Sequence, residues 1–253
     1  NNTALSDGGG VYFGGLAAES IVKDCNFTNN YAKYNGGAID CNASKLFLDN
    51  SIFDANYAQY GAALCREVNA VGGYGTNNTF KNNHAIVVGA ALGWMGSVGI
   101  NITNYTFINN TADYTGGAIY VSPNSHNCTV IDSYFEDSFA GTDGGAIFWA
   151  SDGGSVYGCS FINNTARHGS AIYTPQVYLV ADYCWFGNDA TNYNGRLPVD
   201  GEVNCTYRLF LNSTVNPDNI PLFATSDIIF NLFLYNSSSG KISDYDNSLF
   251  ENL

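Results

Sequence analysis

The sequence predicts an all-β chain: a right-handed parallel β-helix, or solenoid, of about seven rungs that ends in a C-terminal β structure. Three observations lead to this fold class. A unit of about 26 residues recurs along the chain, each unit contains three short β-prone segments separated by turn residues, and no stretch shows the sustained 3.6-residue apolar period of a helix.

The first mark of the recurring unit is a phenylalanine. Successive copies lie 25 to 28 residues apart, at Phe27, Phe53, Phe80, Phe107, Phe135, Phe161 and Phe186. Three residues after each comes a polar residue, at Asn30, Asn56, Asn83, Asn110, Ser138, Asn164 and Asp189. Equivalent side chains of a solenoid stack rung upon rung, so we expect one buried phenylalanine column and one hydrogen-bonded asparagine ladder. Both sets of residues are therefore predicted to be structural.

The second mark is a small-residue strand that opens eight or nine residues after each of the first six phenylalanines. Its copies are Gly36-Gly37-Ala38-Ile39, Gly61-Ala62-Ala63-Leu64, Gly89-Ala90-Ala91-Leu92, Gly116-Gly117-Ala118-Ile119, Gly144-Gly145-Ala146-Ile147 and Gly169-Ser170-Ala171-Ile172. Glycine and alanine suit places where the wall turns or approaches another backbone closely. One unit then makes one three-sided coil, and coils pair in parallel about 4.8 Å apart. A propeller blade needs about 40–45 residues, so this period excludes it.

The repeats divide the chain into three predicted parts. Residues 1–186 form the β-helix, residues 187–224 a capping or linking segment, and residues 225–253 a C-terminal hairpin or the truncated start of a β-sandwich. A solenoid needs a cover over its open end, which the middle segment would supply. Neither a signal peptide nor an apolar run of transmembrane length is present in the sequence, so a membrane or cell-wall anchor is expected outside this fragment.

Composition excludes several kinds of partner. The chain has 9 basic and 22 acidic residues and a net charge of −13, so no nucleic-acid partner is expected, because phosphate neutralisation needs clustered Lys and Arg. Twelve Asn-x-Ser/Thr sequons are compatible with an extracellular, cell-surface location. The seven cysteines have no CxxC spacing, so we predict no metal site and no cofactor. Cys159 and Cys184 both lie two residues before a repeat phenylalanine, where buried free thiols on adjacent rungs are expected.

The pairing of Phe-x-x-Asn with Gly-Gly-Ala-Ile resembles the repeats of polymorphic outer membrane proteins and, more closely, the adhesin-like surface proteins of methanogenic archaea. The phrases Tyr183-Cys184-Trp185-Phe186-Gly187-Asn188 and Leu209-Phe210-Leu211-Asn212-Ser213-Thr214-Val215-Asn216-Pro217 also look like the archaeal family. The resemblance covers essentially the whole chain and is more specific for fold than for function. It implies a β-helix followed by immunoglobulin-like modules, and adhesion to other cells, surface proteins or glycans. It implies no catalytic residues.

An enzyme is the main alternative, because parallel β-helices include polysaccharide lyases and hydrolases. Such enzymes need carboxylates grouped on neighbouring rungs. Ahead of the glycine pairs, only Asp143 and His168 are polar candidates on adjacent rungs, with Arg167 and Asp113 nearby. The sequence therefore predicts no catalytic residue and favours a non-catalytic adhesin. A polysaccharide-cleaving enzyme and a purely structural stalk are the alternatives that stay open.

The predicted binding surface is a short aromatic strip. Strand alternation turns the isoleucines of the small-residue strands inward, so the residue after each points outward on three consecutive rungs, at Tyr120, Phe148 and Tyr173. Trp149 is expected to face the other way. The rings would form a strip about 10 Å long, and flat rings suit the apolar faces of sugars. The alternative is that a loop or the C-terminal segment covers the strip.

Overall fold

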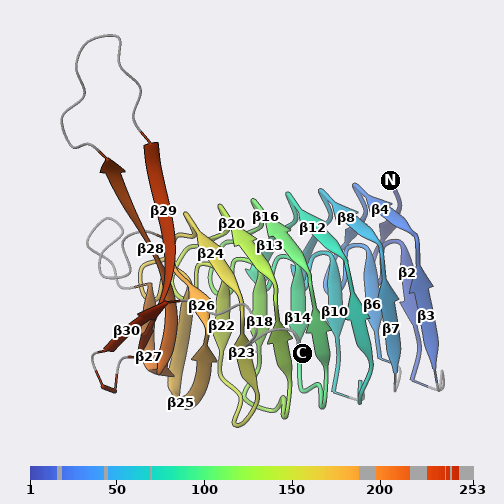
Figure 1. Ribbon diagram of the computed structural model, residues 1–253. Helices are drawn as coiled ribbons and strands as arrows, with labels where there is room; N and C mark the ends of the chain where they lie inside the picture. Colours follow the sequence, from blue (N-terminus) through green and yellow to red (C-terminus); the bar gives the residue numbers. More distant parts are fainter. Residues whose placement is uncertain are drawn as a thin grey trace.

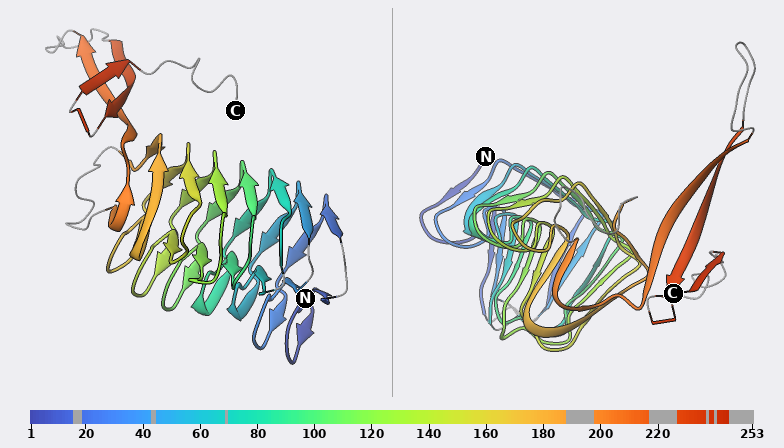
Figure 2. Two further views of the ribbon diagram at one scale, coloured as in Figure 1. Left: turned by 90° about the horizontal axis from the view of Figure 1, so that it is seen from below. Right: turned by 90° about the vertical axis from the view of Figure 1, so that its left-hand side faces the viewer.

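The computed structural model describes residues 1–15, 19–42, 45–68, 70–187, 198–216, 227–236, 238–239 and 241–244. These residues form strands and turns, arranged in coils that stack along one axis (Figure 1; Figure 2). The predicted parallel β-helix of about seven turns is confirmed. No helix in the described part of the chain is long and apolar enough to cross a membrane.

The strands pair into three sheets. A six-stranded sheet consists of β1 (Thr3–Ala4), β5 (Tyr31–Ala32), β9 (Tyr57–Tyr60), β13 (His84–Val88), β17 (Thr111–Ala112) and β21 (Phe139–Ala140). A 14-stranded sheet contains two ladders that meet in β25 (Ile172–Asp182). The first ladder is β2 (Val11–Phe13), β6 (Ile39–Cys41), β10 (Leu64–Arg66), β14 (Leu92–Trp94), β18 (Ile119–Val121) and β22 (Ile147–Trp149). The second is β3 (Ser20–Lys23), β7 (Leu46–Asp49), β11 (Tyr74–Thr76), β15 (Asn101–Thr103), β19 (Thr129–Ile131) and β23 (Ser155–Tyr157), and β27 (Val199–Asn204) also pairs with β25.

The third sheet has 10 strands and carries the repeat phenylalanines. Its members are β4 (Asn26–Thr28), β8 (Ile52–Asp54), β12 (Thr79–Lys81), β16 (Thr106–Ile108), β20 (Tyr134–Glu136), β24 (Ser160–Ile162), β26 (Cys184–Trp185), β28 (Tyr207–Asn216), β29 (Asp227–Asn236) and β30 (Lys241–Asp244). A complete coil thus has four short strands where the sequence predicted three. The additional strand belongs to the six-stranded sheet and follows the asparagine turn, where a buried alanine on each rung lets neighbouring segments pair closely.

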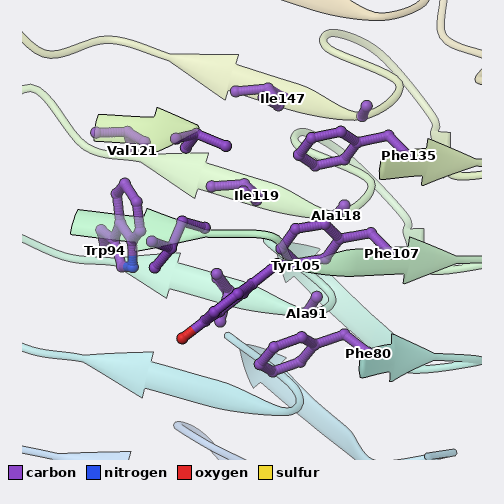
Figure 3. Packing of buried hydrophobic residues seen from close by; sticks show 14 of the residues in the cluster. Phe80, Ala91, Trp94, Tyr105, Phe107, Ala118, Ile119, Val121, Phe135 and Ile147 are labelled. Carbon is purple, nitrogen blue, oxygen red and sulfur yellow. The ribbon is translucent and has the colours of Figure 1, made fainter. Parts of the chain in front are cut away.

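The inside of the coil is organised around the phenylalanine column. Neighbouring rings from Phe27 to Phe186 are parallel within 17° and their centroids lie 4.6–5.4 Å apart. The rings of Phe80, Phe107 and Phe135 are fully buried (Figure 3). Each interior ring therefore contacts two others face to face, so removing one leaves each of its two neighbours with one ring face uncovered.

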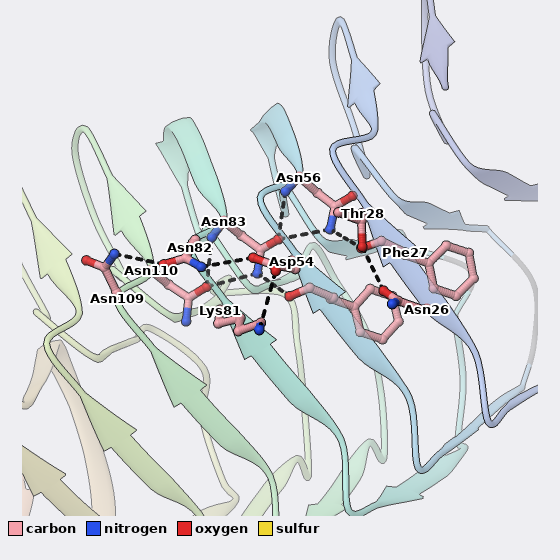
Figure 4. Close-up of polar contacts among 11 residues, drawn as sticks. Asn26, Phe27, Thr28, Asp54, Asn56, Lys81, Asn82, Asn83, Asn109 and Asn110 are labelled. Carbon is pink, nitrogen blue, oxygen red and sulfur yellow. Dashed lines mark hydrogen bonds and ion pairs between the residues drawn. The ribbon is translucent and has the colours of Figure 1, made fainter. Parts of the chain in front are cut away.

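The asparagine ladder runs beside this column and satisfies buried turn groups (Figure 4). Along the four consecutive residues Asn30, Asn56, Asn83 and Asn110, each Nδ2 donates to the Oδ1 of the next residue at 2.9–3.0 Å. The same Oδ1 atoms accept the backbone N–H of the preceding asparagine at 3.0–3.2 Å. Asn110 Nδ2 also donates to the Phe80 carbonyl at 2.9 Å. At the next rung Ser138 carries no amide, and Asn164 resumes the pattern by accepting the Ser138 N–H at 3.0 Å.

Parallel pairing continues past the last repeat phenylalanine. In β27, Val199 pairs with Ile172 and Asp200 with Tyr173, while the start of β28 pairs in parallel with β26. From there β28 pairs antiparallel with β29, and β29 with β30. The coil thus gains a rung that lacks the repeat motif. The predicted boundaries at residues 187–224 and 225–253 stay a prediction, because 188–197, 217–226 and 245–253 lie outside the described residues.

Candidate functional site

One outward-facing position recurs on the strand that follows each small-residue segment. The parallel register aligns its members in a single column, in the order Tyr12, Asp40, Cys65, Gly93, Tyr120, Phe148, Tyr173 and Asp200. The three aromatic residues in the C-terminal half of this column are half-buried, whereas the isoleucine before each is fully buried. Trp149 is also fully buried and belongs to the core. We refer to Tyr120, Phe148 and Tyr173 as the aromatic strip.

The rings of the aromatic strip stack on one another. The centroids of Tyr120 and Phe148 are 5.2 Å apart with an interplanar angle of 13°, and those of Phe148 and Tyr173 are 5.7 Å apart with an angle of 31°. The middle ring, Phe148, therefore has a neighbouring ring on each side, and space beside a ring can exist only at the two ends of the strip. At the C-terminal end the His168 ring also lies near Tyr173, with centroids 6.1 Å apart and an interplanar angle of 37°.

The glycines of the repeat make room for the aromatic strip. Gly144 and Gly169 have φ angles of 66° and 56°, a conformation that non-glycine residues rarely adopt. A Cβ on Gly169 would lie 2.9 Å from the Cβ of Tyr173, and a Cβ on Gly144 would lie 2.7 Å from the Phe148 backbone nitrogen. The same residue that turns the chain therefore also clears the flank of the outward ring.

A cleft of about 410 Å³ opens at the C-terminal end of the strip. Its lining consists of His168, Tyr173, Thr174, Pro175, Asp200, Gly201 and Glu202. The sequence did not single out Asp200 and Glu202, because they follow the last repeat and carry no motif. The pairing of β27 with β25 brings them to the strip, and a spacing of 27 residues from Tyr173 to Asp200 was the one signal that could have placed them.

The cleft is rich in hydrogen-bond acceptors. His168 Nδ1 and Asp143 Oδ1 are 2.7 Å apart, with side chains 53% and 23% exposed. Burial first, and then the charges of Asp143 and Asp200, raise the pKa of Tyr173 above its ordinary value. The Oγ1 atom of Thr174 is buried and has no hydrogen-bond partner within the described part of the chain. Carboxylates and an imidazole at one opening suit the recognition of a polyhydroxylated ligand.

The other polar residues that the sequence placed near this region are arranged differently. Asp113 pairs with His84, whose Nε2 lies 2.9 Å from Asp113 Oδ1, and Arg167 is not part of the cleft lining. No group of three or more His, Cys, Asp or Glu side chains that could hold a metal ion occurs among the residues the structure describes. Cys159 and Cys184 are buried and not joined by a disulfide.

The sequence analysis did not predict a second column of outward tyrosines. The centroids of Tyr157 and Tyr183 are 4.9 Å apart, and those of Tyr183 and Tyr207 are 5.1 Å apart. Tyr183 has a φ of 56° in a turn where most rungs place Asn or Asp, which is uncommon for a bulky residue. The recurrence of tyrosine at intervals of 26 and 24 residues could have revealed this stack.

Three segments of the chain match the family model of the Chlamydia polymorphic membrane protein repeat, at residues 24–42, 104–122 and 158–175. The repeats of this chain are therefore similar to those of polymorphic membrane proteins. Each matched segment contains a repeat phenylalanine and the small-residue strand after it, and two of the three include a ring of the aromatic strip, Tyr120 or Tyr173. No curated protein and no solved structure is significantly similar to the chain. The closer likeness to archaeal adhesin-like proteins stays a prediction.

Proposed function

We propose that this chain is the β-helical part of a cell-surface adhesin that binds carbohydrate on other cells without cleaving it. The observation that carries the proposal is the aromatic strip, which leads into a cleft lined by Asp200, Glu202 and His168. The match to polymorphic membrane protein repeats supports a place at the cell surface. The net charge of −13 is compatible with an extracellular partner other than nucleic acid.

The chemistry of the cleft fits a sugar. A pyranose offers an apolar face of C–H groups that packs on an aromatic ring, and hydroxyls that donate to carboxylates. Tyr173 supplies the ring, and Asp200 and Glu202 supply acceptors on the neighbouring strand. These side chains belong to strands of a continuous parallel ladder, so the site is preorganised and little conformational entropy is lost on binding.

Polysaccharide cleavage is a second candidate, favoured by the hydrogen-bonded Asp143–His168 pair beside Asp200 and Glu202. Glycoside cleavage uses two carboxyl groups that flank the scissile bond. However, the His168 side chain is 53% exposed, and an acid/base pair open to water lacks the desolvation that catalytic sites use. Incubation with neutral polysaccharides and polyuronates, with and without calcium, tests this candidate. Turnover that is lost in both Asp143→Asn and His168→Ala would replace binding by catalysis.

The proposed function is tested on a glycan array and by capture of mixed cells with the purified chain. We expect wild type to bind and the triple variant Tyr120→Ser, Phe148→Ser, Tyr173→Ser to lose binding while staying folded. The matched control is Tyr31→Ser with Tyr57→Ser, which removes a stacked pair (centroids 5.6 Å apart, interplanar angle 11°) from the six-stranded sheet. Unchanged binding by the triple variant would show that the strip is not the site.

A further inference from the structure

The stacking geometry limits where a sugar ring can pack on the strip. Both faces of Phe148 are occupied by its neighbours, at 5.2 and 5.7 Å. Tyr173 is tilted by 31° against Phe148, its ring centroid lies 6.1 Å from that of His168, and beyond it the column continues with Asp200, a small side chain. Tyr173 also lines the cleft, as Phe148 and Tyr120 do not. The strip therefore has space beside it at Tyr173, on the side of the ring that faces the cleft.

The polar groups of the cleft surround that side of the ring. Asp200 and Glu202 come from β27 and line the cleft beside Tyr173. A sugar on Tyr173 would offer hydroxyl groups to both carboxylates.

The charges at the cleft select against acidic sugars. Asp200, Glu202 and the adjacent Asp143 are carboxylates, and among the described residues of the lining the basic side chain is His168, which is already paired with Asp143. A sialic or uronic acid would bring a further negative charge to this group, and the described lining residues include no arginine or lysine to receive it. Like charges in a partly desolvated site disfavour the complex, which a neutral sugar avoids.

We infer that the sugar subsite is the side of the Tyr173 ring that faces the cleft, together with the cleft itself, and that it takes one neutral sugar ring and rejects acidic ones. This rests on the proposed function and narrows it. Tyr120 and Phe148 then act as positioning residues that support the orientation of Tyr173, and do not themselves contact the sugar.

Single variants separate this subsite from the strip as a whole. On an array with neutral galactose, glucose and N-acetylglucosamine glycans beside sialylated and uronate counterparts, wild type should bind the neutral members. We expect Tyr173→Ser to weaken binding at least about tenfold, which corresponds to about 1.4 kcal/mol, whereas Tyr173→Phe keeps the ring and should retain binding. Phe148→Ser removes a ring that supports Tyr173 and should weaken binding by less than Tyr173→Ser does. The matched control is Tyr31→Ser, a tyrosine that stacks on Tyr57 in the six-stranded sheet and lies outside the aromatic strip, and it should change the affinity by less than about threefold.

A double variant tests whether the cleft carboxylates select against acidic sugars. Asp200→Asn combined with Glu202→Gln should reduce the preference for neutral over acidic glycans by about tenfold. Equal losses in Phe148→Ser and Tyr173→Ser, with melting curves showing both folded, would overturn the subsite but leave surface carbohydrate binding in place. Tight wild-type binding of sialylated or uronate glycans would likewise overturn it. If wild type bound no glycan at all, the proposed function itself would fail.

Discussion

The outward column has two halves that share one register and differ in chemistry. In the C-terminal half, Tyr120, Phe148 and Tyr173 are half-buried rings beside an open cleft. In the N-terminal half, Asp40 and Cys65 occupy equivalent positions and are fully buried. The same position on the same scaffold thus becomes either a surface or an interior, depending on what the neighbouring side chains cover.

The cover over Asp40 is itself polar. Asn35 Nδ2 donates to Glu67 Oε1 at 2.8 Å, and the Asn35 backbone N–H donates to Asp7 Oδ1 at 3.0 Å. Neither carboxyl oxygen of Asp40 has a hydrogen-bond partner among the described residues. Burial, and next the charges of Glu67 and Asp7, raise the pKa of Asp40 to about 8. A side chain at an outward position has here become a buried carboxyl without a hydrogen-bond partner among the described residues.

The phenylalanine column shows no such contrast. Phenylalanine recurs on every repeat rung with nearly constant ring spacing, and from Asn30 to Asn164 the asparagine ladder lacks an amide only at Ser138. Rings that stack face to face need a similar ring on the rung above and on the rung below, so one residue type suits this column.

Other inward positions vary, since Arg66, Trp94 and Val121 are equivalent and all buried. The outward column has no such ring-on-ring requirement along its whole length, and its residues range from Asp40 and Cys65 to the aromatic strip. Under the proposed function, the phenylalanine column carries stability and the aromatic strip carries recognition.

The largest expected effect is a pH dependence of the free energy of unfolding, caused by Asp40 in the N-terminal half of the outward column. Between about pH 4 and pH 8 the Asp40 carboxyl is protonated in the folded chain and ionised in the unfolded chain. Unfolding then releases a proton, so raising the pH through this window lowers the free energy of unfolding, by up to about 5 kcal/mol. Denaturant titrations at pH 5, 7 and 9 should show this loss in wild type and a smaller one in Asp40→Asn.

The control for that experiment is Glu19→Gln, which changes an exposed carboxylate whose side chain is 60% exposed. Its pH profile should follow wild type. If Asp40→Asn also followed wild type, the buried carboxyl would not be the source of the pH dependence, and the two halves of the column would differ less than their burial indicates.

The next effect tests the inward column. Phe107→Ala should lower the free energy of unfolding by about 3–5 kcal/mol, because it opens a cavity between Phe80 and Phe135. Phe139→Ala, which removes a ring that is 44% exposed, should cost less than about 1 kcal/mol. Chemical denaturation measures both. Equal losses of unfolding free energy in the two variants would mean that inward and outward rings contribute alike to stability.

A smaller loss is expected in the amide ladder. Asn110→Ala should cost about 1–2 kcal/mol, since it leaves the Asn83 N–H and Nδ2 without their acceptor and the Phe80 carbonyl without a donor. Asn101→Ala changes an exposed side chain and should stay within about 0.5 kcal/mol of wild type. A melting temperature for Asn110→Ala that matched the Asn101→Ala control would argue against a stabilising ladder.

The smallest effect concerns the strip. Tyr120→Ser removes one half-buried ring and one stacking contact, so the free energy of unfolding should fall by only about 0.5–1 kcal/mol. Thermal melting followed by circular dichroism measures this change. A loss as large as that of Phe107→Ala would show that the strip belongs to the core and is not available as a recognition surface.

The sequence by itself determined the rungs, the phenylalanine column and the side of the wall on which Tyr120, Phe148 and Tyr173 lie. It could do so because a repeat of nearly constant length places residues at equal intervals directly above one another, and strand alternation then sets inside and outside. Only the tertiary structure decided that Tyr173 lines a cleft while Tyr120 and Phe148 do not, that Asp200 joins it, and that Asp40 is buried. Those outcomes depend on ring tilt, on a rung without the repeat motif, and on side chains that reach across from neighbouring turns, and none of these follows from a period.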